Sequence, residues 1–157
     1  MQHVKISILL LMIIFFGSCG STEDEIISFD NILTAEIDGK LFTADEVILV
    51  QNTDPQSGVK VIVITASAGA SSEEVMSFNL FNIGGTGTYP LGSNSNWASY
   101  TEDVLKTSEI FITPTSGGEI TITEINDEGM KGTFEFEAYG SGENEVFVEE
   151  GKFEASF

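Results

Sequence analysis

Few residues of this chain could carry catalytic chemistry. Among its 157 residues the single histidine is His3, the single cysteine is Cys19, and all six basic residues are lysines. His3 and Cys19 lie within or beside a hydrophobic N-terminal stretch. Beyond this stretch the chain has no histidine, cysteine or arginine. A Ser-His-Asp triad, a Cys-His nucleophile, a histidine-ligated zinc site and an arginine clamp on phosphate each require one of these residues. We therefore predict that the protein is not an enzyme.

Carboxylates are the abundant functional groups. The chain has 25 Asp and Glu residues and a net charge of −19, which becomes −20 if the first 18 residues, with Lys5, are removed. Such an acidic chain repels nucleic acid, since nucleic-acid binding requires Lys and Arg on the phosphates. Glu135 and Glu137 share one face of a predicted strand, about 6 to 7 Å apart. They would suit a glycoside hydrolase only if their carboxyl groups converged. This is the least favoured hypothesis, because any half-exposed strand alternates in this way.

Calcium is the metal that an acidic chain without histidine accepts best, because calcium takes oxygen ligands. No segment has the spacing of an EF-hand loop. Asp38-Gly39 and Asn126-Asp127-Glu128-Gly129 are short and indicate turns first. We predict no cofactor and no dedicated metal ligand, with a weak Ca2+ site as the open alternative.

One segment combines aromatic rings with side-chain amides, beside a glycine-rich stretch. Its residues are Tyr89, Asn94, Asn96, Trp97 and Tyr100. Aromatic rings offer an apolar surface with a polar tip, and neighbouring amides can hydrogen-bond hydroxyl groups, so the cluster is a candidate ligand-binding site for sugars. The alternative is that Trp97 belongs to the core or its rim and that the asparagines serve turns.

The N-terminus has the pattern of a secretory signal. Met1 to Lys5 form a short positive start, and Ile6 to Phe16 are almost entirely apolar. This run is too short to span a bilayer, which takes about 20 helical residues. Phe16-Gly17-Ser18-Cys19 resembles the lipobox of bacterial lipoproteins, although Leu is the usual residue where Phe16 stands. The resemblance implies that residues 1–18 are a signal peptide and that Cys19 carries a diacylglyceryl membrane anchor.

A short acidic tether follows Cys19. Gly20 to Ser28 span at most about 30 Å when fully extended, and the acidic run Glu23-Asp24-Glu25 resembles the signal that exports Bacteroidota lipoproteins to the outer face of the outer membrane. A plain solvated linker is the alternative. We expect residues 19–28 to be a lipidated tether in the outer membrane, with the protein facing outward.

Residues 29–157 are predicted to form one domain. Period-two alternation and β-branched runs recur between turn signals, which indicates an all-β sandwich or barrel of about nine to ten short antiparallel strands. Asp38-Gly39 predicts a tight hairpin, and Val59–Ala66 predicts a central strand. The glycine-rich segment from Gly84 to Asn96 is predicted to be a loop. Val146–Val148 and Lys152–Phe157 are predicted as two separate strands.

Several strand and turn motifs carry a family resemblance. They are Gly87-Thr88-Tyr89, the run Gly118 to Ile125, Gly132-Thr133-Phe134-Glu135-Phe136, and Glu150 to Ala155. Together they are similar to DUF6252, an uncharacterised family of small Bacteroidota lipoproteins, over most of residues 29–157. The resemblance implies a fold and a bacterial phylum, and it transfers no activity and no catalytic residue.

Three hypotheses for function follow. The first is a surface-exposed outer-membrane lipoprotein acting as a non-catalytic binding or structural module, the second is an accessory carbohydrate-binding lipoprotein, and the third is the carboxylate-dependent hydrolase. A glycan binder needs Trp97 or Tyr100 exposed beside polar side chains. A module that binds a surface protein should show an exposed apolar patch or an unpaired strand edge.

Overall fold

The computed structural model describes residues 28–69, 73–92, 96–104, 110–141 and 144–157, and these contain eleven strands and no helix. The predicted all-β class is confirmed, with one or two strands more than expected. Correspondingly, the described part of the chain has no helix with the length and apolar character needed to cross a membrane. The strands are β1 (Ile32–Ile37), β2 (Lys40–Thr43), β3 (Glu46–Thr53), β4 (Lys60–Ala68), β5 (Glu74–Phe81), β6 (Gly87–Leu91), β7 (Trp97–Thr101), β8 (Ile110–Ile112), β9 (Gly118–Ile125), β10 (Gly129–Tyr139) and β11 (Glu145–Ser156).

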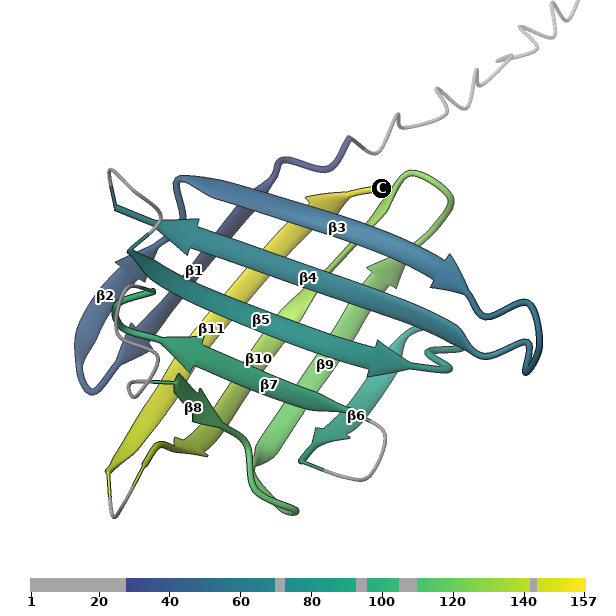
Figure 1. The fold of residues 1–157 in the computed structure, drawn as a ribbon. Coiled ribbons are helices and arrows are strands. Elements are labelled where there is room, and N and C mark those ends of the chain that lie inside the picture. Colours follow the sequence, from purple (N-terminus) through teal and green to yellow (C-terminus); the bar gives the residue numbers. More distant parts are fainter. Residues whose placement is uncertain (1–27, 70–72, 93–95, 105–109, 142–143) are drawn as a thin grey trace, which may run out of the picture.

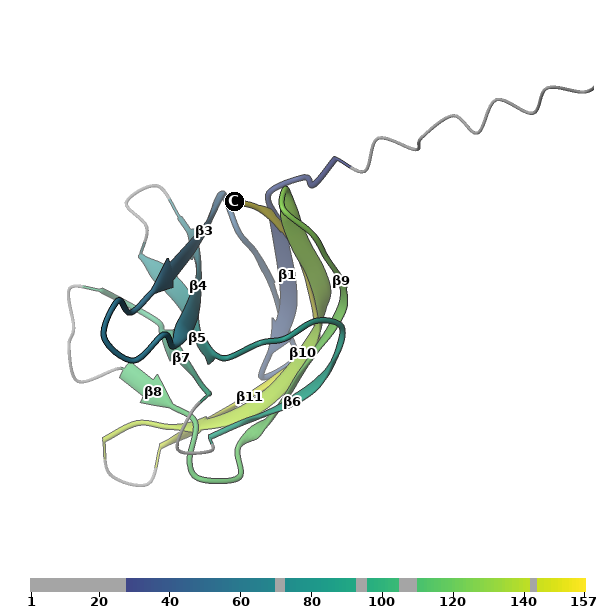
Figure 2. The same ribbon diagram turned by 90° about the vertical axis from the view of Figure 1, so that its right-hand side faces the viewer.

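All strands belong to one antiparallel sheet that curls on itself (Figure 1). The order is β2-β1-β11-β10-β8-β7-β5-β4-β3, and β9 carries β6 on a branch from β10. Strand β10 makes this branch because it pairs with β9 over Met130–Phe136 and with β8 at Tyr139. The curl places β3, β4, β5, β7 and β8 in one layer, opposite β1, β6, β9, β10 and β11 (Figure 2). The fold is a half-barrel whose two sides face each other like a sandwich.

The core fills the space between the two layers. Each strand turns every second side chain inward, as strand geometry requires, and the inward positions are almost all apolar. Phe78 of β5 lies at the centre, with its ring centroid 4.7 Å from that of Phe134 and 5.8 Å from that of Phe136. Aromatic rings from opposite layers therefore join the two halves of the sheet.

The hairpin prediction is confirmed. Asp38 and Gly39 both have positive φ, 49° and 74°, and Ile37 pairs with Lys40 across the turn. A two-residue turn with two positive φ angles matches the twist of the flanking strands.

The predicted loop over Gly84–Asn96 is wrong for its middle, which is strand β6 and pairs with β9 from Gly87 to Leu91. Its glycine and Pro90 are turn signals in sequence, but proline is tolerated on an edge strand. The two predicted C-terminal strands are one strand, β11. A bulge at Glu150, whose φ is 51°, interrupts its pairing without ending it.

Candidate functional site

The two layers present very different outer faces. The outward positions of β1, β9, β10 and β11 include many charged side chains, namely Glu36, Glu119, Lys131, Glu135, Glu137, Glu149, Lys152 and Glu154. Among the outward positions of the other layer, Glu46 at the start of β3 is charged, and those from Ile48 onward carry no charge. We call them the uncharged face: Ile48, Val50, Asn52, Val61, Val63, Thr65, Ser67, Val75, Ser77, Asn79, Phe81, Trp97, Ser99, Thr101, Ile110 and Ile112.

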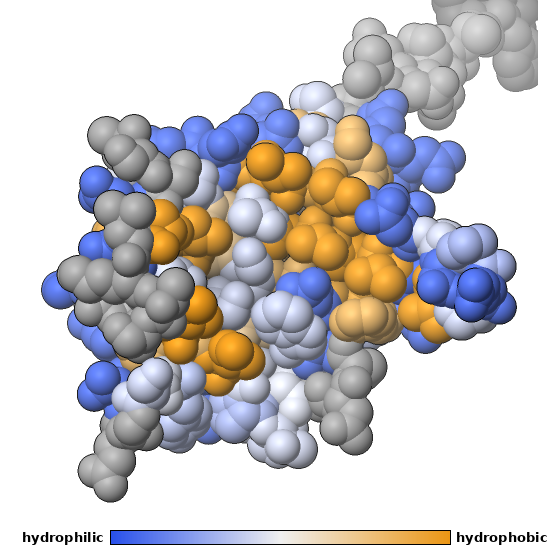
Figure 3. Space-filling model, in the orientation of Figure 1, coloured by the Kyte–Doolittle hydropathy of each residue, from blue (hydrophilic) through white to orange (hydrophobic). Residues whose placement is uncertain are grey.

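The strand register arranges the uncharged face in rows. One row crosses the layer from Ile48 through Thr65, Ser77 and Ser99 to Ile112. Its centre therefore consists of hydroxyl groups, and the Ser77 hydroxyl donates to Thr65 Oγ1 at 3.4 Å. Figure 3 looks onto this face, where hydrophobic residues gather over β3 and β4 and paler, weakly polar residues cross the middle.

The next row contains the most site-like group of the molecule. It runs Val50, Val63, Asn79, Trp97, so that Trp97 lies directly opposite Asn79 on the neighbouring strand. Side chains opposite each other in this way have Cβ atoms about 4.5 to 5.5 Å apart. Trp97 is 38% exposed, and no hydrogen bond joins the Asn79 side chain to any other residue that the structure describes. An exposed indole thus adjoins an available amide and the hydroxyl groups of Ser77 and Ser99.

Tyr100 lies on the other side of the same strand. It follows Trp97 by three positions, and an odd number of steps along a strand reverses the face. Tyr100 is 4% exposed and packs between Phe42 and Phe111, with ring centroids 6.5 and 6.2 Å away. Burial raises the pKa of its hydroxyl, and the nearby carboxylates of Glu74 and Glu102 raise that pKa further. The structure therefore places Tyr100 in the core and Trp97 at the surface.

The remaining residues of the predicted cluster hold the fold together or fall outside the structure. Asn96 is buried, and its Oδ1 accepts from the backbone N–H of Phe81 at 2.9 Å while its Nδ2 donates to the Pro90 carbonyl at 3.4 Å. Tyr89 packs against the core and donates its hydroxyl to the Gly85 carbonyl at 2.8 Å. Asn94 lies outside the described residues, as does the predicted lipidation site Cys19.

Sequence reasoning did not single out Asn79, Ser77 and Ser99. Alternation along β5 by itself puts Ser77 and Asn79 on one face. Their closeness to Trp97 follows only from the pairing of β5 with β7, which skips β6. That pairing is a property of the whole sheet, and no local sequence signal predicts it.

The carboxylate pair considered for hydrolysis lies on the charged face. Glu135 and Glu137 both point outward from β10, and Glu119 of β9 lies directly opposite Glu135. A hollow of about 420 Å³ beside them is lined by Glu119, Glu135, Glu150 and Lys152, among others. A general acid of this kind is held protonated by apolar surroundings, whereas Glu119, Glu135 and Glu150 are exposed. Among the described residues, no group of three or more carboxylates could hold a metal ion.

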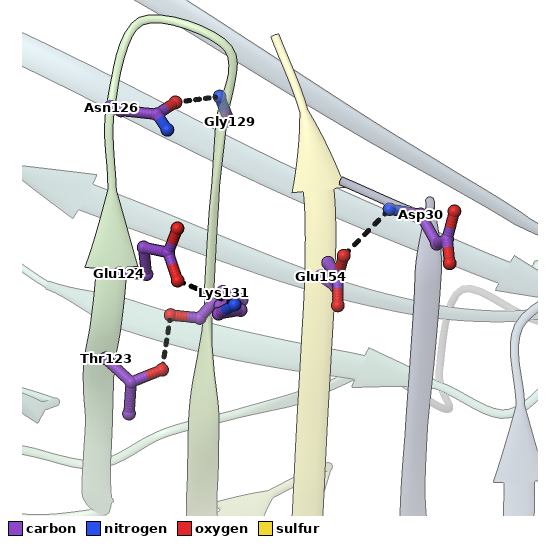
Figure 4. A network of polar contacts seen from close by, with 7 residues as sticks. All are labelled: Asp30, Thr123, Glu124, Asn126, Gly129, Lys131 and Glu154. Atoms are coloured by element: carbon purple, nitrogen blue, oxygen red, sulfur yellow. Dashed lines mark hydrogen bonds and ion pairs between the residues drawn. The ribbon is translucent and has the colours of Figure 1, made fainter. Parts of the chain in front are cut away.

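The start of the domain is fastened to the charged layer, close to the C-terminus. The backbone N–H of Asp30 donates to Glu154 Oε1 at 2.9 Å (Figure 4), and Asn31 Oδ1 accepts from the backbone N–H of Ser156. In the neighbouring turn, Asn126 Oδ1 accepts from the backbone N–H of Gly129 at 3.1 Å, so this amide oxygen, considered above for calcium, serves the turn. An ion pair of 2.6 Å between Lys131 and Glu124 joins the strands that follow and precede it.

Comparison with known proteins defines the family. No curated protein and no solved structure matches the chain. Over residues 30–155 the sequence matches the model of a domain of unknown function, DUF6252. This match covers most of the chain and almost all of the folded domain, so the protein belongs to the DUF6252 family.

Proposed function

We propose that this protein is a non-catalytic binding module, lipid-anchored through Cys19 on the outward side of a bacterial outer membrane, and that it binds an uncharged glycan on the uncharged face. One observation carries the proposal: the exposed ring of Trp97 lies opposite the available amide of Asn79, within the uncharged face. Such a ring offers an apolar surface to the C–H face of a sugar, and the amide and hydroxyl groups beside it can hydrogen-bond sugar hydroxyls.

The charge distribution supports an uncharged ligand. Without residues 1–18 the chain has a side-chain charge of −20, yet the uncharged face has no carboxylate and no lysine. An anionic ligand would be repelled by the body of the protein and would find no cation on this face. A cationic ligand would be drawn instead to the carboxylates of the charged face. An uncharged chain of sugars requires neither sign.

The position of the polar groups favours a glycan over a protein partner. Interfaces between proteins usually have an apolar centre and a polar rim. Here the hydroxyl groups of Thr65, Ser77 and Ser99 cross the middle, and the aliphatic side chains lie around them. A sugar chain suits this arrangement, because each sugar has apolar faces and hydroxyl-rich edges.

The fastening of the N-terminus supports the anchored geometry. The domain begins at the charged layer, where Asp30 and Asn31 bond to β11. The uncharged face belongs to the opposite layer, so a tether from Cys19 leaves it free. The tether, of about 30 Å at most, would hold the domain close to the membrane.

The test is affinity electrophoresis of the chain from Ser21, which retains every core residue from Phe29 to Ala155. Gels contain uncharged glucans, mannans or xylans, or the anionic polysaccharides alginate and polygalacturonate. We expect retardation by an uncharged polysaccharide, and about 30-fold weaker binding in Trp97→Ala, as for an aromatic residue that contributes about 2 kcal/mol.

Phe147→Ala is the matched control, because Phe147 is an aromatic residue of similar exposure, 45%, on the charged layer. This variant should bind as the wild type does. Retardation by anionic polysaccharides alone, or by none of the panel, would contradict the proposal. An equal loss in both variants would place the ligand elsewhere.

A further inference from the structure

Three strands form the edges of the sheet among the described residues, and two of these edges are protected against pairing with another chain. Strand β2 is short, four residues, and begins with Lys40; β6 contains Pro90. Short length, lysine and proline are the usual means by which edge strands avoid association. Strand β3 has eight residues with neither lysine nor proline, and Ile48 and Val50 are exposed on it. It is therefore the unprotected edge of the described sheet.

The hydrogen-bond pattern shows which backbone groups of β3 face outward from the sheet. The N–H of Asp54 donates to the carbonyl of Val59 at 2.9 Å, where β3 turns into β4. In an antiparallel ladder every second residue bonds to the same neighbour, so Ile48 and Val50 bond to β4. The residues between them, Val47, Leu49 and Gln51, direct their N–H and C=O groups away from β4.

The second ladder of β4 agrees with this assignment. The N–H of Asn82 donates to the carbonyl of Lys60 at 2.8 Å, so the even-numbered residues of β4 bond to β5 and its odd-numbered residues are left for β3. No strand of the described sheet pairs with β3 on its other side.

Open space adjoins this edge. A hollow of about 430 Å³ is lined by Leu49, Val50 and Gln51 on one side, and by Asp127 and Phe157 on the other. The connection between β2 and β3 lies close to β1, where the N–H of Ala44 donates to the carbonyl of Leu33, and β11 also approaches β3, whereas the hollow adjoins Leu49 and Gln51. The outward-directed groups of Leu49 and Gln51 can therefore be reached by an added strand.

We propose that β3 pairs edge to edge with β3 of a second copy of this chain, antiparallel, with Leu49 opposite Leu49 of the second copy. This register uses all three outward-directed residues, because Val47 then lies opposite Gln51 on each side, and it forms about six backbone hydrogen bonds. The contact is a two-fold interface in which each chain contributes the same strand.

The placement of charge favours a second copy as the partner. In this register Glu46, the one charged residue of β3, lies opposite the uncharged Asn52 of the second copy, and Ile48 lies opposite Val50. Two strongly acidic domains would thus meet where neither carries opposed charges. Anchoring of both copies in one membrane would raise their effective concentration. The inference does not depend on the proposed glycan site, although pairing would join two uncharged faces into one continuous layer.

Sedimentation equilibrium of the chain from Ser21 tests the proposal, together with two double variants. Ile48→Lys with Val50→Lys brings lysines of the two chains opposite each other across the interface. The matched control, Ile110→Lys with Ile112→Lys, adds the same charge at the far side of the same face. The exposed fractions match, because Ile112 is 49% exposed and Ile48 is 47% exposed. We expect a concentration-dependent dimer for the wild type and the control, and a monomer for the β3 variant. Thermal unfolding of each variant should confirm that it is folded.

A cross-link tests the register. The chain from Ser21 contains no cysteine, so Ile48→Cys with Val50→Cys should form disulfide-linked dimers under mild oxidation. A wild type that stays monomeric at hundreds of micromolar overturns the proposal and leaves the edge to a strand of another protein. A dimer that survives the β3 lysines and is lost with the control lysines also overturns it, because the contact would then be face to face.

Discussion

Two asparagines near Trp97 should differ in how much their truncation to alanine changes the stability of the domain. Asn96 is buried, and its Oδ1 accepts from the backbone N–H of Phe81 at 2.9 Å. Asn79 stands on the uncharged face and has no hydrogen-bond partner among the described residues. Asn96→Ala should therefore destabilise the domain, and Asn79→Ala should leave its stability almost unchanged.

The magnitude follows from the hydrogen bonds. Truncation of the Asn96 side chain leaves the partly buried N–H of Phe81 without this acceptor, which lowers the free energy of unfolding by about 1 to 3 kcal/mol. The second bond, from Nδ2 to the Pro90 carbonyl, is long at 3.4 Å and adds little. A loss of about 2 kcal/mol corresponds to a fall in Tm of roughly 7 °C for a domain of this size, from about 2.1 cal/mol/K of unfolding entropy per residue. Asn79→Ala should change the stability by less than about 0.5 kcal/mol.

Urea and thermal unfolding of the chain from Ser21 measure both effects. The midpoint should shift for Asn96→Ala without a change in the dependence of the unfolding free energy on urea concentration. Equal losses in the two variants, or a greater loss in Asn79→Ala, would refute the assignment of Asn96 to the fold and Asn79 to the surface.

Three further predictions concern the core, a turn and the site. Burial raises the pKa of Tyr100, so the folded state favours the neutral form of its hydroxyl. The contribution of this group to the free energy of unfolding is therefore fully present below the unfolded pKa near 10. Above that pH the free energy of unfolding falls by about 1.4 kcal/mol per pH unit. Tyr100→Phe should remove this part of the decline, as measured by urea unfolding from pH 9 to 12. Gly92 has φ +84°, and an added Cβ would collide with the Pro114 carbonyl, so Gly92→Ala should lower Tm by more than Asn96→Ala does. Asn79→Asp should weaken glycan binding in affinity gels while Tm stays within about 2 °C of the wild type, and unchanged binding would remove Asn79 from the site.

Local sequence signals account for much of the fold. Alternation predicts which side chains of β9 and β10 turn inward, and Asp38-Gly39 predicts the first hairpin with the φ angles that are observed. The same signals fail at β6, because Pro90 and the glycine of this strand indicate a turn when considered alone. Pairing with β9 overrides that preference. Pairing between distant segments cannot be predicted from the residues of either segment alone.

The site was predictable only in part. Grouping Trp97 with Tyr100 by nearness in sequence disregards the period of a strand, which sends residues three apart to opposite faces. The true neighbours of Trp97, Asn79 and Ser77, lie about 20 residues away and reach it because β5 skips β6 to pair with β7. Closure of the half-barrel through β10 is likewise a property of the whole sheet.

The fluorescence of Trp97 tests the central claim most directly, because it is the only tryptophan in the chain. An uncharged polysaccharide that retards the protein in affinity gels should also change the tryptophan emission, saturably and with the same midpoint, since the ligand covers an exposed indole. Phe147→Ala should give the same titration. Saturable binding that leaves the emission unchanged would contradict the account, because the ligand would then lie away from the uncharged face around Trp97.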